Sequence, residues 1–194
     1  MEVLNLEDVE IIYTKKSKIK NIKLKILSAT QLEVTFGHFC SKQTIFDFIS
    51  TKQKWIFKKL NEFKNREYFE QTQMIFGAII VDCFEGKNYE IFLQNELNWY
   101  LKSSVENYSK IMQVEPSSIT IKKLKAIWGN CDFKNNLKFN SSLAKFPREI
   151  IDYVVVHELA HIKYKHHQKP FWDFVEFAMP DYKQRRQKLK KFTF

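Results

Sequence analysis

The sequence predicts an α+β fold, on two observations about its periodicity and one about its composition. Apolar and polar residues alternate in short runs, which is the period of half-buried strands, while other stretches repeat apolar residues at helical spacing. Of the 194 residues, 44% are hydrophobic and only four are glycine and four proline, as expected for a folded globular chain. This length suits one ordinary domain, or one compact domain with a smaller lobe.

The first part of the chain, residues 1–94, is expected to contain strands, a helix and a hairpin that pack with the rest as one unit. Residues 9–39 alternate in short runs and predict a small antiparallel sheet. Apolar residues at helical spacing predict an amphipathic helix from about 41 to 69, with room for one break. Apolar runs over 74–93 flank Glu-Gly-Lys-Asn at 85–88, which predicts a hairpin turn.

The second part, residues 95–194, is expected to form the functional domain. Its predicted elements in order are a helix over 96–112, a strand over 119–124, a loop over 128–135, a strand over 137–143, and helices over 147–164, 170–179 and 181–191. The two strands are expected to pair. Pro147 suits the first turn of its helix, because the N–H that proline lacks is not needed there.

The helix predicted over 147–164 carries the pentapeptide His157-Glu158-Leu159-Ala160-His161. Residues four apart lie above one another on one face of a helix, so both histidines can direct a ring nitrogen at one metal ion. Glu158 lies about 100° further round the helix, within reach of a water at such a site, where it can act as a general base. The pattern predicts a zinc-dependent hydrolase with one zinc ion per chain. The plain alternative is a helix whose histidines are surface or core residues.

A catalytic zinc needs a third protein ligand and an open position for water. His166 and His167 follow directly after this helix, and Glu176 on the next helix offers a carboxylate instead. The residues alone leave these three alternatives open. The helix itself suits a cleft, because its apolar residues form one face while Tyr153, the two histidines and Tyr164 lie on a separate stripe.

Further motifs accompany the pentapeptide in collinear order between residues 115 and 190. They are Trp128-Gly129-Asn130-Cys131, Leu137-Lys138-Phe139-Asn140, the run from Tyr153 to His161, His167, Phe171-Trp172 and Pro180-Asp181-Tyr182. In this order they resemble the YgjP-like metallopeptidases, which are relatives of the SprT-like proteases among the zincins. The resemblance implies a zincin-like metallopeptidase domain with its active-site helix packed on a small antiparallel sheet.

The resemblance also implies particular roles for residues of this chain. It places the third zinc ligand at His167, with a swap to His166 as the alternative, and makes Glu158 the general base for attack of water on a peptide bond. The strand around 137–140 is expected to edge the cleft, where an extended peptide adds as another strand. Candidates for contact with the substrate are Leu137, Phe139 and Tyr164.

The chain departs from the family pattern at Ile127, where arginine is common, and at Asn130, where serine is common. These changes bear on substrate preference more than on zinc binding. Supporting roles are open to further residues: oxyanion stabilisation to Tyr153, Tyr164 and Tyr182, and orientation of the ligand imidazoles to Asp173 and Glu176.

The formal net charge of +10 attracts nucleic acid, anionic membrane or acidic protein. Basic residues accompany aromatic ones around Trp55 and fill the last helix, which makes nucleic acid a candidate partner. The resemblance agrees with this, because relatives of the SprT type act on DNA-associated proteins. One alternative function is a basic nucleic-acid-binding module with a structural zinc, whose fourth ligand would be a residue such as Cys131. Another is a zinc amidohydrolase acting on a non-peptide substrate.

Three features bear on the compartment. The N-terminus lacks the basic start and apolar core of an export signal. No apolar stretch approaches the roughly 20 residues that cross a membrane. Cys40, Cys83 and Cys131 are odd in number and widely spaced, as expected for reduced thiols. The sequence therefore predicts a cytoplasmic enzyme, without membrane contact, that acts on a peptide or protein.

Overall fold

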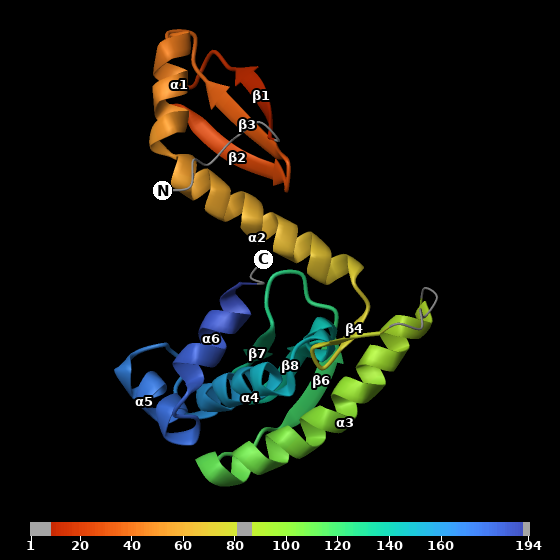
Figure 1. Cartoon of the computed structure of the whole chain (residues 1–194). Coiled ribbons are helices and arrows are strands. Elements are labelled where there is room, and N and C mark those ends of the chain that lie inside the picture. Colours follow the sequence, from red (N-terminus) through yellow and green to blue (C-terminus); the bar gives the residue numbers. More distant parts are fainter. Residues whose placement is uncertain (1–8, 81–86, 192–194) are drawn as a thin grey trace. The chain divides into compact units, whose positions relative to one another are not determined.

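The computed structural model describes residues 9–80 and 87–191, and the chain divides into two compact units, Met1–Glu70 and Gln71–Phe194 (Figure 1). This division falls earlier than the boundary expected at 94/95. The reason is helix α3 (Lys87–Met112), which spans that boundary and packs along helix α4 (Arg148–Lys163) within the second unit. Each unit combines strands with helices, so the predicted α+β class is confirmed.

The first unit contains a three-stranded sheet with the order β1-β3-β2, formed by β1 (Glu10–Lys15), β2 (Lys23–Ser28) and β3 (Gln31–Phe36). β2 and β3 are antiparallel, but β1 and β3 are parallel. The sheet is therefore mixed, and the expectation of an antiparallel sheet was wrong. The three strands alternate in direction along the chain, and β3 inserts between the first two, so it runs the same way as β1.

Two helices follow this sheet, α1 (Lys42–Thr51) and α2 (Gln53–Gln71), and the single break that the sequence allowed lies at Lys52. Ser41 caps α1, since its Oγ accepts a hydrogen bond from the Thr44 backbone N–H at 3.1 Å. Buried apolar residues of β3 and of both helices form the core of this unit: Leu32, Val34, Ile45, Ile49, Ile56 and Leu60.

The second unit begins with a two-stranded hairpin, β4 (Met74–Ile75) and β5 (Ala78–Ile79), which turns at Phe76 and Gly77. Both turn residues have positive φ angles, 48° and 87°. The hairpin predicted over 74–93 is thus far shorter than expected. Residues from 87 onward form α3 because Leu93, Leu97 and Leu101 bury one helical face. Positions 85 and 86 of the predicted turn lie outside the described residues.

The sheet of the second unit has the order β6-β8-β7, with β6 (Ser118–Lys122), β7 (Gly129–Cys131) and β8 (Asn136–Asn140). The predicted pairing of the strands near 119–124 and 137–143 is confirmed, but these strands, β6 and β8, are parallel. β7 lies in the segment predicted as a loop and pairs antiparallel with β8. Hence this sheet is also mixed rather than antiparallel, and β7 forms one edge. A 3-10 turn (Ser141–Lys145) follows β8.

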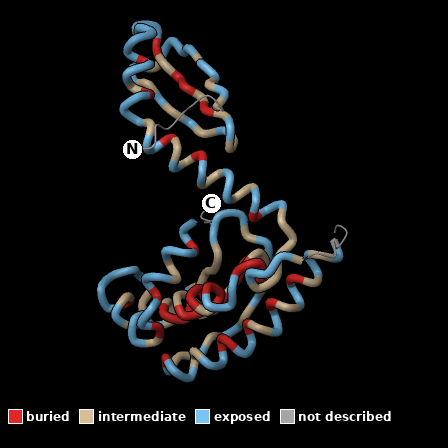
Figure 2. The backbone as a smooth tube through the Cα atoms, in the orientation of Figure 1, coloured by how far each residue is buried: buried red, intermediate tan, exposed pale blue. Residues whose placement is uncertain are grey.

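The helix α4 is central to the second unit, and α5 (Lys169–Ala178) and α6 (Tyr182–Lys190) follow it, as predicted. It contacts α3, β7, α5 and α6, and buried residues are concentrated along it (Figure 2). Tyr100 and Ser104 of α3 donate hydrogen bonds to one carboxylate oxygen of Asp152 at 2.8 and 2.6 Å. Packing and hydrogen bonds therefore hold α4 on several sides, which makes it a rigid support for side chains on its remaining face.

Candidate metal centre

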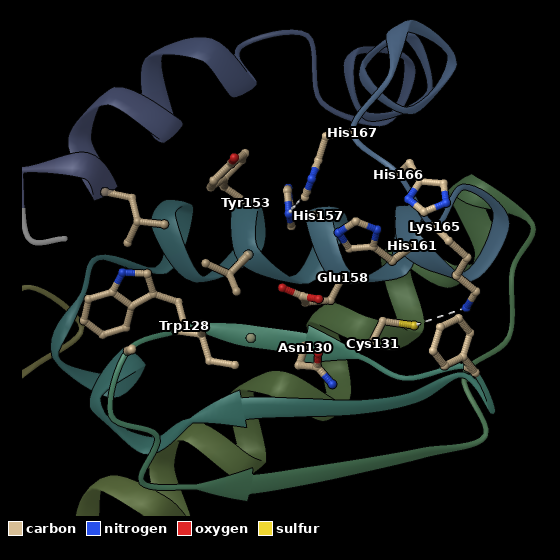
Figure 3. A pocket seen from close by; sticks show the side chains of 16 residues that line it. Trp128, Asn130, Cys131, Tyr153, His157, Glu158, His161, Lys165, His166 and His167 are labelled. Carbon is tan, nitrogen blue, oxygen red and sulfur yellow. Dashed lines mark hydrogen bonds between the residues drawn. The ribbon is translucent and has the colours of Figure 1, made fainter. Parts of the chain in front are cut away.

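Three histidine side chains converge above α4 (Figure 3). His157 and His161 come from the helix, and His167 comes from the loop that joins α4 to α5. One ring nitrogen of each lies within 4.8 Å of those of the other two, and the Nε2 atoms of His157 and His167 are 3.0 Å apart. His166 points into the same cavity but is outside this cluster, and Glu176 instead pairs with Lys183. Of the three alternatives for the third ligand, His167 is therefore the one that the structure places beside the two helix histidines.

The ring contacts of the two helix histidines indicate which of their nitrogens can bind a metal. Nδ1 of His161 lies 3.1 Å from the backbone carbonyl oxygen of Tyr164, a contact that suits a donating Nδ1–H and an unprotonated Nε2. Nδ1 of His157 is buried without a hydrogen-bond partner among the described residues. Its Nε2, which faces His167, is the nitrogen that remains to act as a ligand.

Trp172 of α5 positions His167, although the loop that carries His167 is exposed. The indole N–H donates to the backbone carbonyl of His167 at 3.2 Å. The indole ring also stacks on the His167 imidazole, with centroids 5.6 Å apart and planes at 24°. Tyr182 stacks on Trp172 in turn, and the Arg186 guanidinium lies 4.4 Å from the indole centroid. The His167 ring therefore rests on a column of stacked groups that α5 and α6 hold in place.

The electrostatic environment favours the neutral form of these imidazoles. Burial, together with the neighbouring His161 and His167, lowers the pKa of His157 to about 3. Burial also lowers the pKa of His161 and that of His167, and the positive charge of Arg186 adds to the effect at His167. Neutral imidazole is the form that binds a metal. Three such nitrogens at one point are the donor set that zinc takes in catalytic sites, so the residues fit a zinc ion.

Glu158 is buried between α4 and the edge strand β7, and its side chain is 5% exposed. Burial raises the pKa of its carboxyl group to about 8. A carboxyl group with a pKa near neutrality can both accept and release a proton at physiological pH, as a general acid–base catalyst must. Gly129 on β7 leaves room for the Glu158 side chain, because a Cβ at position 129 would lie only 2.7 Å from Cγ of Glu158. Sequence reasoning noted Gly129 only as part of the Trp128-Gly129 motif and missed this function.

A cavity of about 570 Å³ opens over the histidine cluster and Glu158. The other residues that line it are Ala126, Ile127, Trp128, Gly129, Asn130, Cys131, Phe133, Tyr153, Val154, Lys165, His166 and Leu189. Its floor is therefore α4, and one side is the stretch from Ala126 through β7, as Figure 3 shows for the labelled residues. A volume of this size suits part of an extended peptide or another small substrate.

The residues expected to contact a substrate do not line this cavity. Leu137 and Phe139 are 0% exposed because they belong to β8, the central strand of the sheet. Tyr164 packs its ring against Phe174, with centroids 5.6 Å apart. The cleft edge is β7 rather than the strand around 137–140, and this corrects the expectation from sequence.

Of the residues expected to assist the reaction, the structure places some at the cavity and others away from it. Tyr153 lines the cavity, and burial raises the pKa of its hydroxyl to about 12, so it stays protonated and can donate a hydrogen bond. Tyr182 instead stacks on Trp172. Asp173 pairs with Lys169 at 2.6 Å on the surface of α5, so the structure gives it no contact with a ligand imidazole. Tyr153 is the remaining candidate for oxyanion stabilisation.

Hydrogen bonds from Asn140 hold the segment that leads into β7. Its amide nitrogen donates to the backbone carbonyls of Leu124 and Ile127, both at 2.9 Å, and its side chain is fully buried.

Ile127 and Asn130, where the chain departs from the family pattern, both line the cavity. Cys131 lines it too but is not part of the metal cluster, and Cys83 lies outside the described residues.

The basic side chains of α6 mostly have acidic partners. Lys183 pairs with Glu176, Arg185 with Asp181 and Lys188 with Glu149, while Arg186 covers Trp172. The prediction of a nucleic-acid partner therefore gains no support from this helix.

Across the described part of the chain, no helix combines the length and the apolar composition that a membrane span requires.

A family model described as "YgjP-like, metallopeptidase domain" matches residues 20–96 and 85–192. Among solved structures, the metallopeptidase zymogen abylysin of Pyrococcus abyssi is 23% identical, with a TM-score of 0.43 over 46% of this chain and 90% of that chain. The zymogen jannalysin of Methanocaldococcus jannaschii is 24% identical, with a TM-score of 0.42 over 47% of this chain and 94% of that chain. No curated protein matches the sequence.

Proposed function

The chain belongs to the YgjP-like metallopeptidase family, and on that premise we propose that it is a zinc-dependent peptidase whose single zinc ion is held by His157, His161 and His167. The observation that carries this proposal is the convergence of the three imidazoles, whose ligand nitrogens lie within 4.8 Å of one another. A three-histidine donor set leaves a position open for water. Zinc bound there would act as a Lewis acid on the scissile carbonyl and lower the pKa of a bound water.

Glu158 acts as the general base in this proposal. Its carboxylate removes a proton from the attacking water and then transfers that proton to the departing amine, so one group serves both halves of the reaction. The raised pKa of Glu158 supports this role, as does its position at the floor of the cavity. Tyr153 would donate a hydrogen bond to the oxygen on which negative charge develops.

The substrate would lie along β7. This strand forms an edge of its sheet and lines the cavity, so its outer backbone groups are available to pair with an extended peptide. Gly129 brings that backbone close to Glu158. The pairing would place a peptide bond over the histidine cluster without needing a specific side chain, which suits an enzyme that acts on unfolded segments.

A structural zinc site is less consistent with this arrangement. Structural sites are normally closed by four protein ligands. Among the described residues the cluster holds three histidines, without Cys131 or a carboxylate. The three-ligand set and the adjoining cavity therefore favour a catalytic zinc site over a structural one.

The decisive experiment compares the wild-type protein with Glu158→Gln and with Glu149→Gln as a control on the same helix. We expect one zinc per chain in all three proteins, by metal analysis. Wild type and Glu149→Gln should cleave an unfolded protein substrate equally, and Glu158→Gln should be slower by a factor of about 100 or more. Wild type that lacks stoichiometric zinc, or Glu158→Gln that keeps full activity, would refute the proposal. If the protein cleaved only non-peptide amides, it would be an amidohydrolase rather than a peptidase.

A further inference from the structure

The two ends of the cavity differ in chemistry. Trp128 and Tyr153 lie at one end, whereas Cys131, Lys165 and His166 lie at the other, with the histidine cluster between them (Figure 3). A peptide that spans the cluster would therefore meet aromatic surface on one side of its scissile bond. On the other side it would meet a basic group. This asymmetry provides a basis for selecting substrates.

Lys165 is held in place at the basic end. It follows the C-terminal cap of α4, and its side chain is partly buried. Its ammonium group donates three hydrogen bonds: to Oδ1 of Asn135 at 3.0 Å, to the backbone carbonyl of Asp132 at 3.2 Å and, more weakly, to Sγ of Cys131 at 4.0 Å. These contacts fix the ammonium group beside the turn between β7 and β8, so little side-chain entropy remains to be lost when it binds a ligand.

The contacts of Lys165 are all with uncharged groups. The backbone carbonyl and the amide oxygen are neutral, and burial raises the pKa of the Cys131 thiol, which favours its neutral form. The nearby Asp132 carboxylate is turned toward Asn136 and the backbone N–H of Lys134. No ion pair among the described residues involves Lys165. A partly buried cation whose hydrogen bonds go only to neutral groups can exchange the weakest of them, the one to Sγ of Cys131, for a stronger one to a carboxylate of the substrate.

We propose that Lys165 binds a carboxylate of the substrate, so that the enzyme prefers peptides with a carboxylate on the side of the scissile bond that faces the β7–β8 turn. This inference rests on the proposed function, because it concerns the substrate of that same site. The carboxylate can come from an acidic side chain or from the C-terminus of a peptide. His166 lines the same end of the cavity.

The first test uses zinc-loaded wild-type protein and a fixed set of peptides. Each peptide is made with glutamate or glutamine at each position in turn, and with a free or an amidated C-terminus. We expect one of these changes to lower kcat/KM by roughly tenfold, the effect of losing a charged hydrogen bond. A change at one glutamate identifies a side-chain carboxylate, and a change on amidation identifies the C-terminus. Equal cleavage of all pairs overturns the inference.

Variants of Lys165 separate recognition from structural support. Lys165→Met should abolish the preference for the carboxylate, Lys165→Arg should keep it, and Lys165→Glu should favour lysine at the same position. If Lys165 only stabilised the β7–β8 turn, Lys165→Met would slow cleavage of both members of a pair equally. A carboxylate preference that Lys165→Met leaves unchanged therefore overturns the inference.

A binding measurement keeps this test independent of the proposed reaction. Glu158→Gln protein retains the cavity and Lys165, and calorimetry can measure its affinity for the same peptide pairs. The carboxylate member should bind roughly tenfold more tightly, and Lys165→Met in this background should remove the difference. If wild type cleaves nothing, the proposed function fails, while this comparison still decides the role of Lys165: equal affinities overturn it.

Discussion

Gly129 on β7 and Glu158 on α4 are in such close contact that a Cβ at position 129 would lie 2.7 Å from both Cγ and Oε1 of the glutamate. Real side chains do not approach this closely, so any larger residue at 129 must displace the carboxylate or push β7 away from the helix. The space for the proposed general base is therefore defined by the absence of a side chain on the neighbouring strand.

Gly129→Ala should lower peptidase activity without removing the metal. We expect kcat/KM to fall at least about tenfold, because a displaced base no longer reaches the reacting water, while zinc content stays at the wild-type level. Asn130→Ala on the same strand is the matched control and should retain zinc as well. Wild-type kcat/KM in Gly129→Ala would contradict this account of the contact.

Zinc-free protein should lose stability as the pH rises above about 7. The pKa of Glu158 in the folded protein, about 8, lies above its ordinary value of 4.5. The folded state therefore keeps a proton that the unfolded chain has released, and stability falls as pH rises through this interval. The three histidines of the cluster act in the opposite direction, because their pKa is lowered, but most of that contribution is gained below about pH 7.

Urea unfolding of chelator-treated protein checks this prediction. Between pH 7 and 8.5 the free energy of unfolding of the wild type should fall by about 1 kcal/mol more than that of Glu158→Gln. The comparison removes the contributions of all other titrating groups. Parallel pH profiles for the two proteins would show that Glu158 is not buried in a protonated form.

Trp172→Ala should weaken zinc binding through His167. The substitution removes both the stacked ring and the hydrogen bond to the His167 backbone, and supports of this kind are typically worth a factor of about 10 in metal affinity. Trp172→Phe keeps a ring but no N–H, so a smaller loss is expected. Competition with a chromophoric chelator measures the affinities. Trp99→Ala, at an exposed position of α3, is the control, and an equal loss in that variant would argue against a specific role.

Asn140→Leu should destabilise the second unit. It leaves the backbone carbonyls of Leu124 and Ile127 without their donor and the backbone N–H of Ser142 without its acceptor, all near a fully buried position. We expect a loss of roughly 2 to 4 kcal/mol in the free energy of unfolding, measured with urea. Asn98→Ala on the exposed face of α3 should change stability by less than about 0.5 kcal/mol.

The local elements of this protein could be predicted because they depend on local periodicity. Apolar residues at three- and four-residue spacing predicted the helix that became α4, and alternation predicted β6 and β8. Long-range pairing could not be predicted in the same way. The segment 87–93 is apolar enough for a strand, and only its packing in α3 against the rest of the second unit makes it helical.

The order of strands also required the tertiary structure. Leu137 and Phe139 alternate with polar residues, and that pattern is the same in a central strand and in a strand that edges a cleft. Insertion of β8 between β6 and β7 buries both side chains and gives the edge to β7, whose three residues are too few to show a period of their own.

The sequence by itself determined that His157 and His161 share one face with Glu158 beside them, because helical geometry relates residues four apart whatever surrounds the helix. Only the tertiary structure decided which neighbouring residue completes the cluster. His166 and His167 differ by one position in a loop, where no repeating backbone geometry relates a residue to its neighbours. Contacts from α5 and α6, chiefly that of Trp172 with His167, turn one of these imidazoles toward the helix and leave the other outside the cluster.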